Sequence, residues 1–210
     1  ACVLAVNYRL MPEHPRASGI EDVRAAYKWL LANGPEGPGP ADTLIVAGDS
    51  AGGNLALAVI AHTRNVGLRR ADAVIVMSPQ TDATFQGPSL LRNAQTDVMQ
   101  GPSLGPVARA PKPVRLWMSL AMNRINPSDP SVSPLFGDLS DLPPTLIQVS
   151  TAEMFLDDAV RYVNKANAAG SEVLLQAWPH MIHVWHAFEL PEAQAAFEAM
   201  REFLVPRVPD

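Results

Sequence analysis

Several features that often point to a function are scarce or absent in this chain of 210 residues. The one cysteine, Cys2, excludes an internal disulfide, which suits a reducing compartment. There is no run of about 18 apolar residues and no signal-peptide pattern, so we expect a cytoplasmic protein without a transmembrane segment. Basic residues do not cluster and the net charge is −5, which argues against nucleic acid as a partner.

The composition itself is that of a folded protein. Hydrophobic residues make up 48% and charged residues 18%, and the mean hydropathy is +0.04. We therefore expect one domain over residues 1–210 with a buried core.

Short apolar runs alternate with helical patterns along the chain. Such alternation predicts an α/β fold, with a mostly parallel sheet and helices on both faces. Ser18 and Glu21 form a capping-box pattern that begins the first predicted helix, and Asn33-Gly34 ends it. The stretch 84–142 is long for a simple connection, so we expect an insertion that contributes to a cap or lid; its Pro- and Gly-rich part, 84–113, is left unassigned. Strands are predicted at 2–6, 43–47, 73–77, 145–149 and 172–178, and further helices at 53–65, 114–125, 155–169 and 191–204.

Between the second predicted strand and its helix lies Gly48-Asp49-Ser50-Ala51-Gly52. Gly-x-Ser-x-Gly in this context is the nucleophile-elbow pattern, in which a tight turn lifts the serine hydroxyl clear of the sheet. Side chains two residues before or after the serine would collide, so both positions are expected to require glycine. The Ala51 N–H would then face a developing oxyanion, and Asp49 and Gly53 would shape the elbow. The alternative is a purely structural turn. A dinucleotide or phosphate loop is disfavoured, because Gly-x-Gly-x-x-Gly and Gly-Lys-Ser/Thr are absent.

A serine nucleophile needs a base, and in this arrangement the chain order is serine, acid, histidine. His180, His183 and His186 follow the last predicted strand, whereas His14 and His62 come too early. The alternative for this cluster is ordinary loop polarity. A zinc site is less favoured, because no carboxylate joins at ligand spacing.

Four segments resemble the hormone-sensitive-lipase-like carboxylesterases of the α/β-hydrolase superfamily. They are YRLMPEHPRASGIEDVRAAYKWL (8–30), GDSAGGNLA (48–56), SDPSVSPLFGDLSDLPPTLIQVS (128–150) and GSEVLLQAWPHMIHVWHAF (170–188). The resemblance covers essentially the whole chain in order. It implies the α/β-hydrolase fold and a serine carboxylesterase that hydrolyses short- to medium-chain acyl esters through an acyl-enzyme, with a small-molecule ester as substrate and no cofactor or metal.

The resemblance also implies roles for individual residues. Ser50 matches the nucleophile, and His183 matches the base in the family's Gly-x-x-His segment, with His180 in place of the glycine. Setting Asp157-Asp158 against the family's Asp-Glu places Glu153 at the catalytic acid.

Some of these assignments have alternatives. Asp157 is the second candidate for the acid, although Asp157 and Asp158 also suit the first turn of a helix, whose positive end favours carboxylates. Asp82 matches a family loop position, and we expect it to be a turn-forming residue rather than a reactive one.

One motif of the family is missing from this sequence. There is no His-Gly-Gly-Gly, the loop that supplies oxyanion donors. By resemblance, residues 2–8 correspond to the family's fourth strand, which predicts that the first strands and the N-terminal cap precede residue 1. Residues 2–8 would then lack a neighbour beside strand 43–47. The Ala51 N–H would be the remaining oxyanion donor, and the truncated form would have weak activity or none.

Other functions stay open. An amidase or thioesterase would use the same triad, and a non-catalytic ligand-binding member of the fold would keep only the pocket; the retained His183 argues against the latter. The resemblance also implies that the last strand and helix, 172–178 and 191–204, could form a homodimer interface. Candidate pocket residues, which could equally be core, are Met99, Trp117, Met118, Met122 and Trp185.

Overall fold

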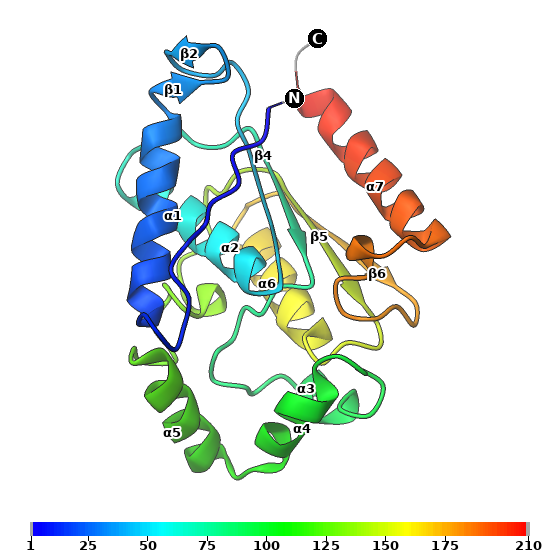
Figure 1. Ribbon diagram of the computed structural model, residues 1–210. Helices are drawn as coiled ribbons and strands as arrows, with labels where there is room; N and C mark the ends of the chain where they lie inside the picture. The colour runs from blue at the N-terminus through cyan, green and yellow to red at the C-terminus, as the bar shows by residue number, and fades with distance from the viewer. Residues whose placement is uncertain (1, 209–210) are drawn as a thin grey trace.

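The computed structural model describes residues 2–208, and its centre is a parallel sheet of four strands (Figure 1). The strands are β3 (Ile45–Asp49), β4 (Ala73–Met77), β5 (Thr145–Ser150) and β6 (Val173–Trp178), hydrogen-bonded in that order. All three neighbouring pairs are parallel, which confirms the predicted sheet. A separate antiparallel pair of two-residue strands, β1 (Asn33–Gly34) and β2 (Gly37–Pro38), follows the first helix.

Helices cover both faces of this sheet, as predicted (Figure 1). Alternate residues of a strand point to opposite faces, so β4 and β5 have to be apolar on both sides. Val74, Val76 and Ile147 pack in the larger core cluster with residues of α1, α2 and α6. Ala73, Ile75 and Leu146 pack with residues of α7 on the other face. The helices are α1 (Arg16–Leu30), α2 (Ser50–Asn65), α3 (Ser89–Arg92), α4 (Gly101–Arg109), α5 (Lys112–Asn123), α6 (Leu156–Ala168) and α7 (Pro191–Leu204).

Most predicted elements lie within a few residues of their observed positions, but the predicted start of the first helix was wrong. Helix α1 begins at Arg16 with Pro15 at the N-cap, and no side chain caps it. Ser18 instead lies in the first turn and is buried. Proline fixes φ near −65°, a value that suits a helix start, so the chain enters the helix before the predicted capping box.

The unassigned stretch contains two helices. Helices α3, α4 and α5 lie together at one end of the molecule (Figure 1). Phe85, Leu90, Ala94 and Ala108 pack there against Met154 and Phe155, which precede α6. That this stretch contributes to a cap stays a prediction. Within residues 2–208, no helix combines the length and the apolar character needed to cross a bilayer.

The predicted strand at residues 2–6 is wrong. This segment has no regular secondary structure, and Val3, Leu4 and Val6 are exposed. A cavity of about 470 Å³ lies between the segment and β3. Paired strands lie about 4.8 Å apart, so a backbone across such a cavity has no partner for its hydrogen bonds. Among the described residues, no strand pairs with the outer edge of β3.

Candidate active site

Ser50 lies at the junction of β3 and α2, where the chain turns from strand to helix within one residue. Its φ is 49°, in the left-handed region that a residue other than glycine seldom adopts. A Cβ on Gly48 would lie 2.4 Å from the carbonyl oxygen of Gly52, so the turn cannot accept a side chain at Gly48. The strained serine and the crowding at Gly48 are therefore those expected of an elbow.

The steric reason predicted for Gly52 was wrong. A Cβ built on Gly52 meets no atom within 4 Å. The crowded position is the next one, because a Cβ on Gly53 would lie 2.7 Å from Cγ1 of Val76 on β4. Gly53 thus lets α2 pack closely on the sheet.

Three side chains from three strand ends meet beside this turn. His183 Nε2 lies 2.9 Å from Ser50 Oγ, and His183 Nδ1 lies 2.6 Å from Glu153 Oε2. Glu153 is fully buried, His183 is nearly so, and Ser50 is half-buried. Glu153 follows β5 and His183 follows β6, at the carboxyl edge where sites of open α/β sheets gather. In the tautomer with the proton on Nδ1, the imidazole donates to the carboxylate of Glu153, and Nε2 accepts from the hydroxyl of Ser50.

The buried carboxylate of Glu153 has three donors. Ser78 Oγ–H and the Ser150 N–H each donate to Oε1 at 2.8 Å, and His183 occupies Oε2. An unpaired carboxylate in this position would be very costly, so these bonds are what allow the charge to be buried. Ser78 was not singled out from the sequence. The only indication was its position directly after the apolar strand 73–77.

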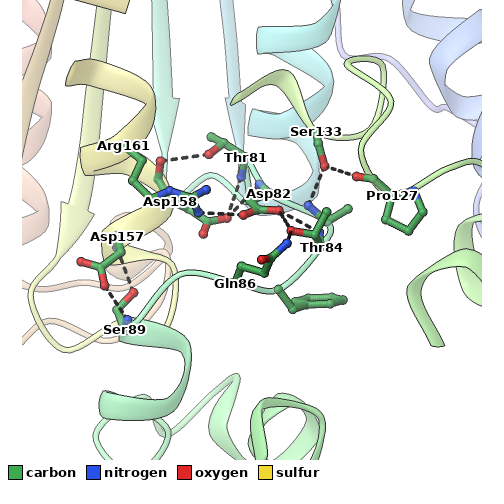
Figure 2. Close-up of polar contacts among 12 residues, drawn as sticks. Thr81, Asp82, Thr84, Gln86, Ser89, Pro127, Ser133, Asp157, Asp158 and Arg161 are labelled. Carbon is green, nitrogen blue, oxygen red and sulfur yellow. Dashed lines mark hydrogen bonds and ion pairs between the residues drawn. The ribbon is translucent and has the colours of Figure 1, made fainter. Parts of the chain in front are cut away.

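The alternative acid, Asp157, is directed elsewhere. Its carboxylate accepts the N–H of Ser89 (Figure 2). It also pairs with Arg92 on α3, rather than reaching His183. In return, the Ser89 hydroxyl accepts the Asp157 N–H at 2.9 Å. Asp157 therefore ties α3 to the start of α6.

Asp82 forms the turn expected of it. Its Oδ1 accepts the Thr84 N–H at 2.8 Å, and its Oδ2 pairs with Arg161 at 2.7 Å (Figure 2). Asp158 lies beside it and accepts the N–H groups of Thr81 and Asp82, each at 3.0 Å. Burial, and then the neighbouring Asp82 charge, raise the pKa of Asp158 to about 8. This cluster fixes the loop after β4 to α6.

The three histidines after β6 have different surroundings. His180 is exposed, and its backbone N–H donates to Thr151 Oγ1 at 3.2 Å. His186 is buried, its Nε2 lies 2.8 Å from Gln148 Oε1, and burial lowers its pKa to about 4. Of the three, His183 is the one that contacts Ser50. Over residues 2–208, no group of three or more His, Cys, Asp or Glu side chains is placed to hold a metal ion.

The cavity between β3 and residues 3–8 reaches the elbow, where Ser50, Ala51 and Gly52 line it. The oxyanion role of the Ala51 N–H stays a prediction. Trp185, one of the five candidate pocket residues, is completely buried core. The other four are exposed and do not line this cavity: Met99, Trp117, Met118 and Met122.

Comparison with known proteins identifies the fold. Residues 1–187 match a family model described as alpha/beta hydrolase fold. The chain is 36% identical over 207 residues to an acetyl-hydrolase of Streptomyces hygroscopicus, covering 97% of this chain and 64% of that protein. It is 32% identical over 196 residues to carboxylesterase NlhH of Mycobacterium tuberculosis, covering 93% and 60%.

Solved structures give the same result. An esterase from the bacterial hormone-sensitive lipase family superposes with a TM-score of 0.81 at 35% identity, covering 97% of this chain and 65% of that one. EstE5, studied after soaking with p-nitrophenyl butyrate, superposes with a TM-score of 0.78 at 38% identity, covering 94% and 64%. The chain thus spans slightly less than two thirds of the length of these relatives. It belongs to the α/β-hydrolase fold family, among the hormone-sensitive-lipase-like members that its sequence resembles.

Proposed function

We propose that the protein is a serine carboxylesterase that hydrolyses short- to medium-chain acyl esters. One observation carries the proposal: a single imidazole, that of His183, lies within hydrogen-bond distance of both Ser50 and Glu153. This is the arrangement that activates a serine for acyl transfer. The names of the relatives, which include esterases and carboxylesterases, support the same reaction class.

In this mechanism Ser50 Oγ attacks the carbonyl carbon of the ester while its proton passes to His183 Nε2. Glu153 stabilises the imidazolium that forms, and it does so without taking up the proton itself. The Ala51 N–H and the positive end of α2 stabilise the oxyanion of the tetrahedral intermediate. His183 then gives its proton to the leaving alcohol, and an acyl-enzyme remains on Ser50. A water molecule, deprotonated by His183, releases the acid and restores the serine.

The direct test is hydrolysis of p-nitrophenyl butyrate by the protein and by Ser50→Ala. We expect turnover that the substitution abolishes. Butyryl anilide and butyryl thioester, matched in acyl chain, test the amidase and thioesterase alternatives. A preference for either over the ester would contradict the proposed substrate class.

A fluorophosphonate probe separates a catalytic protein from a ligand-binding one. An activated serine forms a covalent adduct with it, whereas a pocket alone does not. We expect labelling of the protein and none of Ser50→Ala. Failure to label, together with failure to hydrolyse any of the three substrates, would favour the non-catalytic member of the fold.

A further inference from the structure

Ser78 joins two parts of the site that are otherwise separate in the chain. It is completely buried and follows the last residue of β4. Its hydroxyl donates to Glu153 Oε1 at 2.8 Å and accepts the N–H of Val184 at 3.3 Å. A serine hydroxyl has one proton, so donation to the carboxylate leaves its lone pairs for Val184. One oxygen atom thus connects the turn that carries Glu153 with the loop that carries His183.

Both ends of this connection are conformationally unusual. Ser78 has a φ of 49° and is followed by proline, and Val184, the residue after His183, has a φ of 52°. A positive φ is rare for residues other than glycine and is a marked outlier for a β-branched one. Such conformations persist where the surroundings enforce them, and they often occur at functional sites. The bond from Val184 to Ser78 is one such enforcing contact.

We propose that Ser78 is a positioning residue for the Glu153–His183 pair. Its hydroxyl fixes the carboxylate rotamer through Oε1, so that Oε2 faces His183 Nδ1, and it holds the strained residue that follows the histidine. This role rests on the proposed function of the triad. It adds a fourth side chain, which acts through the acid and the loop of the base and does not touch the substrate.

The neighbouring carboxylates bind other partners, so the contact between Ser78 and Glu153 can be removed without disturbing theirs. Asp97 Oδ2 accepts the Met154 N–H at 2.9 Å, and Asp157 and Asp158 are directed at backbone N–H groups of residues 89, 81 and 82. Loss of the Ser78 hydroxyl would leave Glu153 Oε1 with the Ser150 N–H alone. With one donor left, the carboxylate would be free to rotate, so that Oε2 would no longer be held facing His183 Nδ1.

The experiment compares Ser78→Ala and Ser78→Gly with Ser133→Ala. Ser133 is an equally buried serine whose hydroxyl also accepts one backbone N–H, from Ala83, and donates once, to Pro127 O, but it does not contact the triad. Ser78→Gly removes the hydroxyl and also relieves the positive φ, so it separates the hydroxyl from backbone strain. Two measurements are made on each folded variant: kcat and kcat/KM for p-nitrophenyl butyrate across pH, and the NMR titration of the His183 ring.

We expect both Ser78 variants to lower kcat about 10- to 100-fold with little change in KM, the range for loss of a hydrogen bond to a charged group. The acid limb of the pH profile and the His183 ring titration should move to lower pH in both, because a carboxylate that has turned away no longer stabilises the imidazolium. Ser133→Ala should move neither. Unchanged pH behaviour in the Ser78 variants, or an effect in Ser78→Ala that Ser78→Gly does not share, would overturn the proposal. A moved ring titration in a protein that hydrolyses no ester would support the positioning role while refuting the esterase function.

Discussion

The elbow makes a sharp prediction because one added methyl group has opposite consequences at two glycines four residues apart. At Gly48 the new Cβ would lie 2.4 Å from the Gly52 carbonyl oxygen and 2.9 Å from the Gly53 nitrogen, both backbone atoms. At Gly52 the same methyl group would meet nothing within 4 Å. Gly48→Ala and Gly52→Ala are therefore chemically identical substitutions, but the added Cβ has very different steric surroundings at the two positions.

The expected energies follow from those distances. Backbone atoms cannot rotate away as a side chain can, so Gly48→Ala should cost about 3 kcal/mol, the upper part of the range for overpacking. Gly52 lies in the first turn of α2, where alanine lowers the entropy of the unfolded chain and should stabilise by about 0.4–1 kcal/mol. For a domain of this size, the combined difference corresponds to roughly 7–16 °C in Tm.

Thermal and urea unfolding of the two variants and of the parent protein measure this difference. Gly53→Ala is the intermediate case, because its Cβ would lie 2.7 Å from a side-chain atom of buried Val76 rather than from backbone. The expected order of stability is Gly52→Ala, then Gly53→Ala, then Gly48→Ala. A Gly52→Ala variant as unstable as Gly48→Ala would refute the steric account of the elbow.

Further predictions concern the acid, two buried titratable groups and the core. Glu153→Gln should lower kcat for p-nitrophenyl butyrate about 10⁴-fold without unfolding the protein, because an amide does not stabilise the imidazolium; activity close to that of the parent would exclude Glu153 as the acid. Since the folded pKa of Asp158 is raised to about 8, above its unfolded value, stability should fall as pH rises from about 4 to about 8, and urea unfolding of Asp158→Asn should show a smaller fall. The folded pKa of His186 is lowered to about 4 by burial, so stability should fall as pH drops from about 6.5 to about 4, and urea unfolding of His186→Gln should show a weaker fall. Leu57→Ala, at a completely buried side chain, should cost about 2–5 kcal/mol in urea unfolding, whereas Leu174→Ala, at a half-exposed one, should cost clearly less; equal costs would contradict the core assignment.

Much of the sheet could be predicted because buried parallel strands are apolar on both faces. The run at 73–77 coincides with β4, and the run at 145–149 falls one residue short of β5. The order of the reactive residues along the chain was also available, because the resemblance supplied Ser50, Glu153 and His183 as separate motifs. The sequence could not supply their distances, which depend on how the strand ends meet.

The wrong predictions have a common physical cause. Residues 2–6 carry a strand-like apolar pattern, but pairing needs a neighbouring backbone, and a cavity lies where that neighbour would be. Gly52 fits the elbow pattern, yet whether a Cβ collides depends on the path of the chain around it. Ser78 carries no motif at all, and its role follows from contacts with residues about 75 and 106 positions away in the chain. Local sequence patterns indicate which structures a segment can adopt, whereas contacts with distant segments decide which one it adopts.

The placement of strained residues indicates what holds the site together. Seven residues other than glycine have positive φ among those described, and four lie at the site: Ser50, Ser78, His180 and Val184. Ser50 and Ser78 each follow the last residue of a strand directly, so their positions are set by the register of the sheet rather than by loops. Glu153 follows the end of β5 by three residues, and a bond from the Ser150 N–H ties it back to that end. The positions of Ser50, Ser78 and Glu153 therefore depend mainly on β3, β4 and β5. The long connection at 84–142 supports the same turn, because Asn93 Nδ2 donates to the Glu153 carbonyl oxygen at 2.7 Å and Asp97 Oδ2 accepts the Met154 N–H at 2.9 Å.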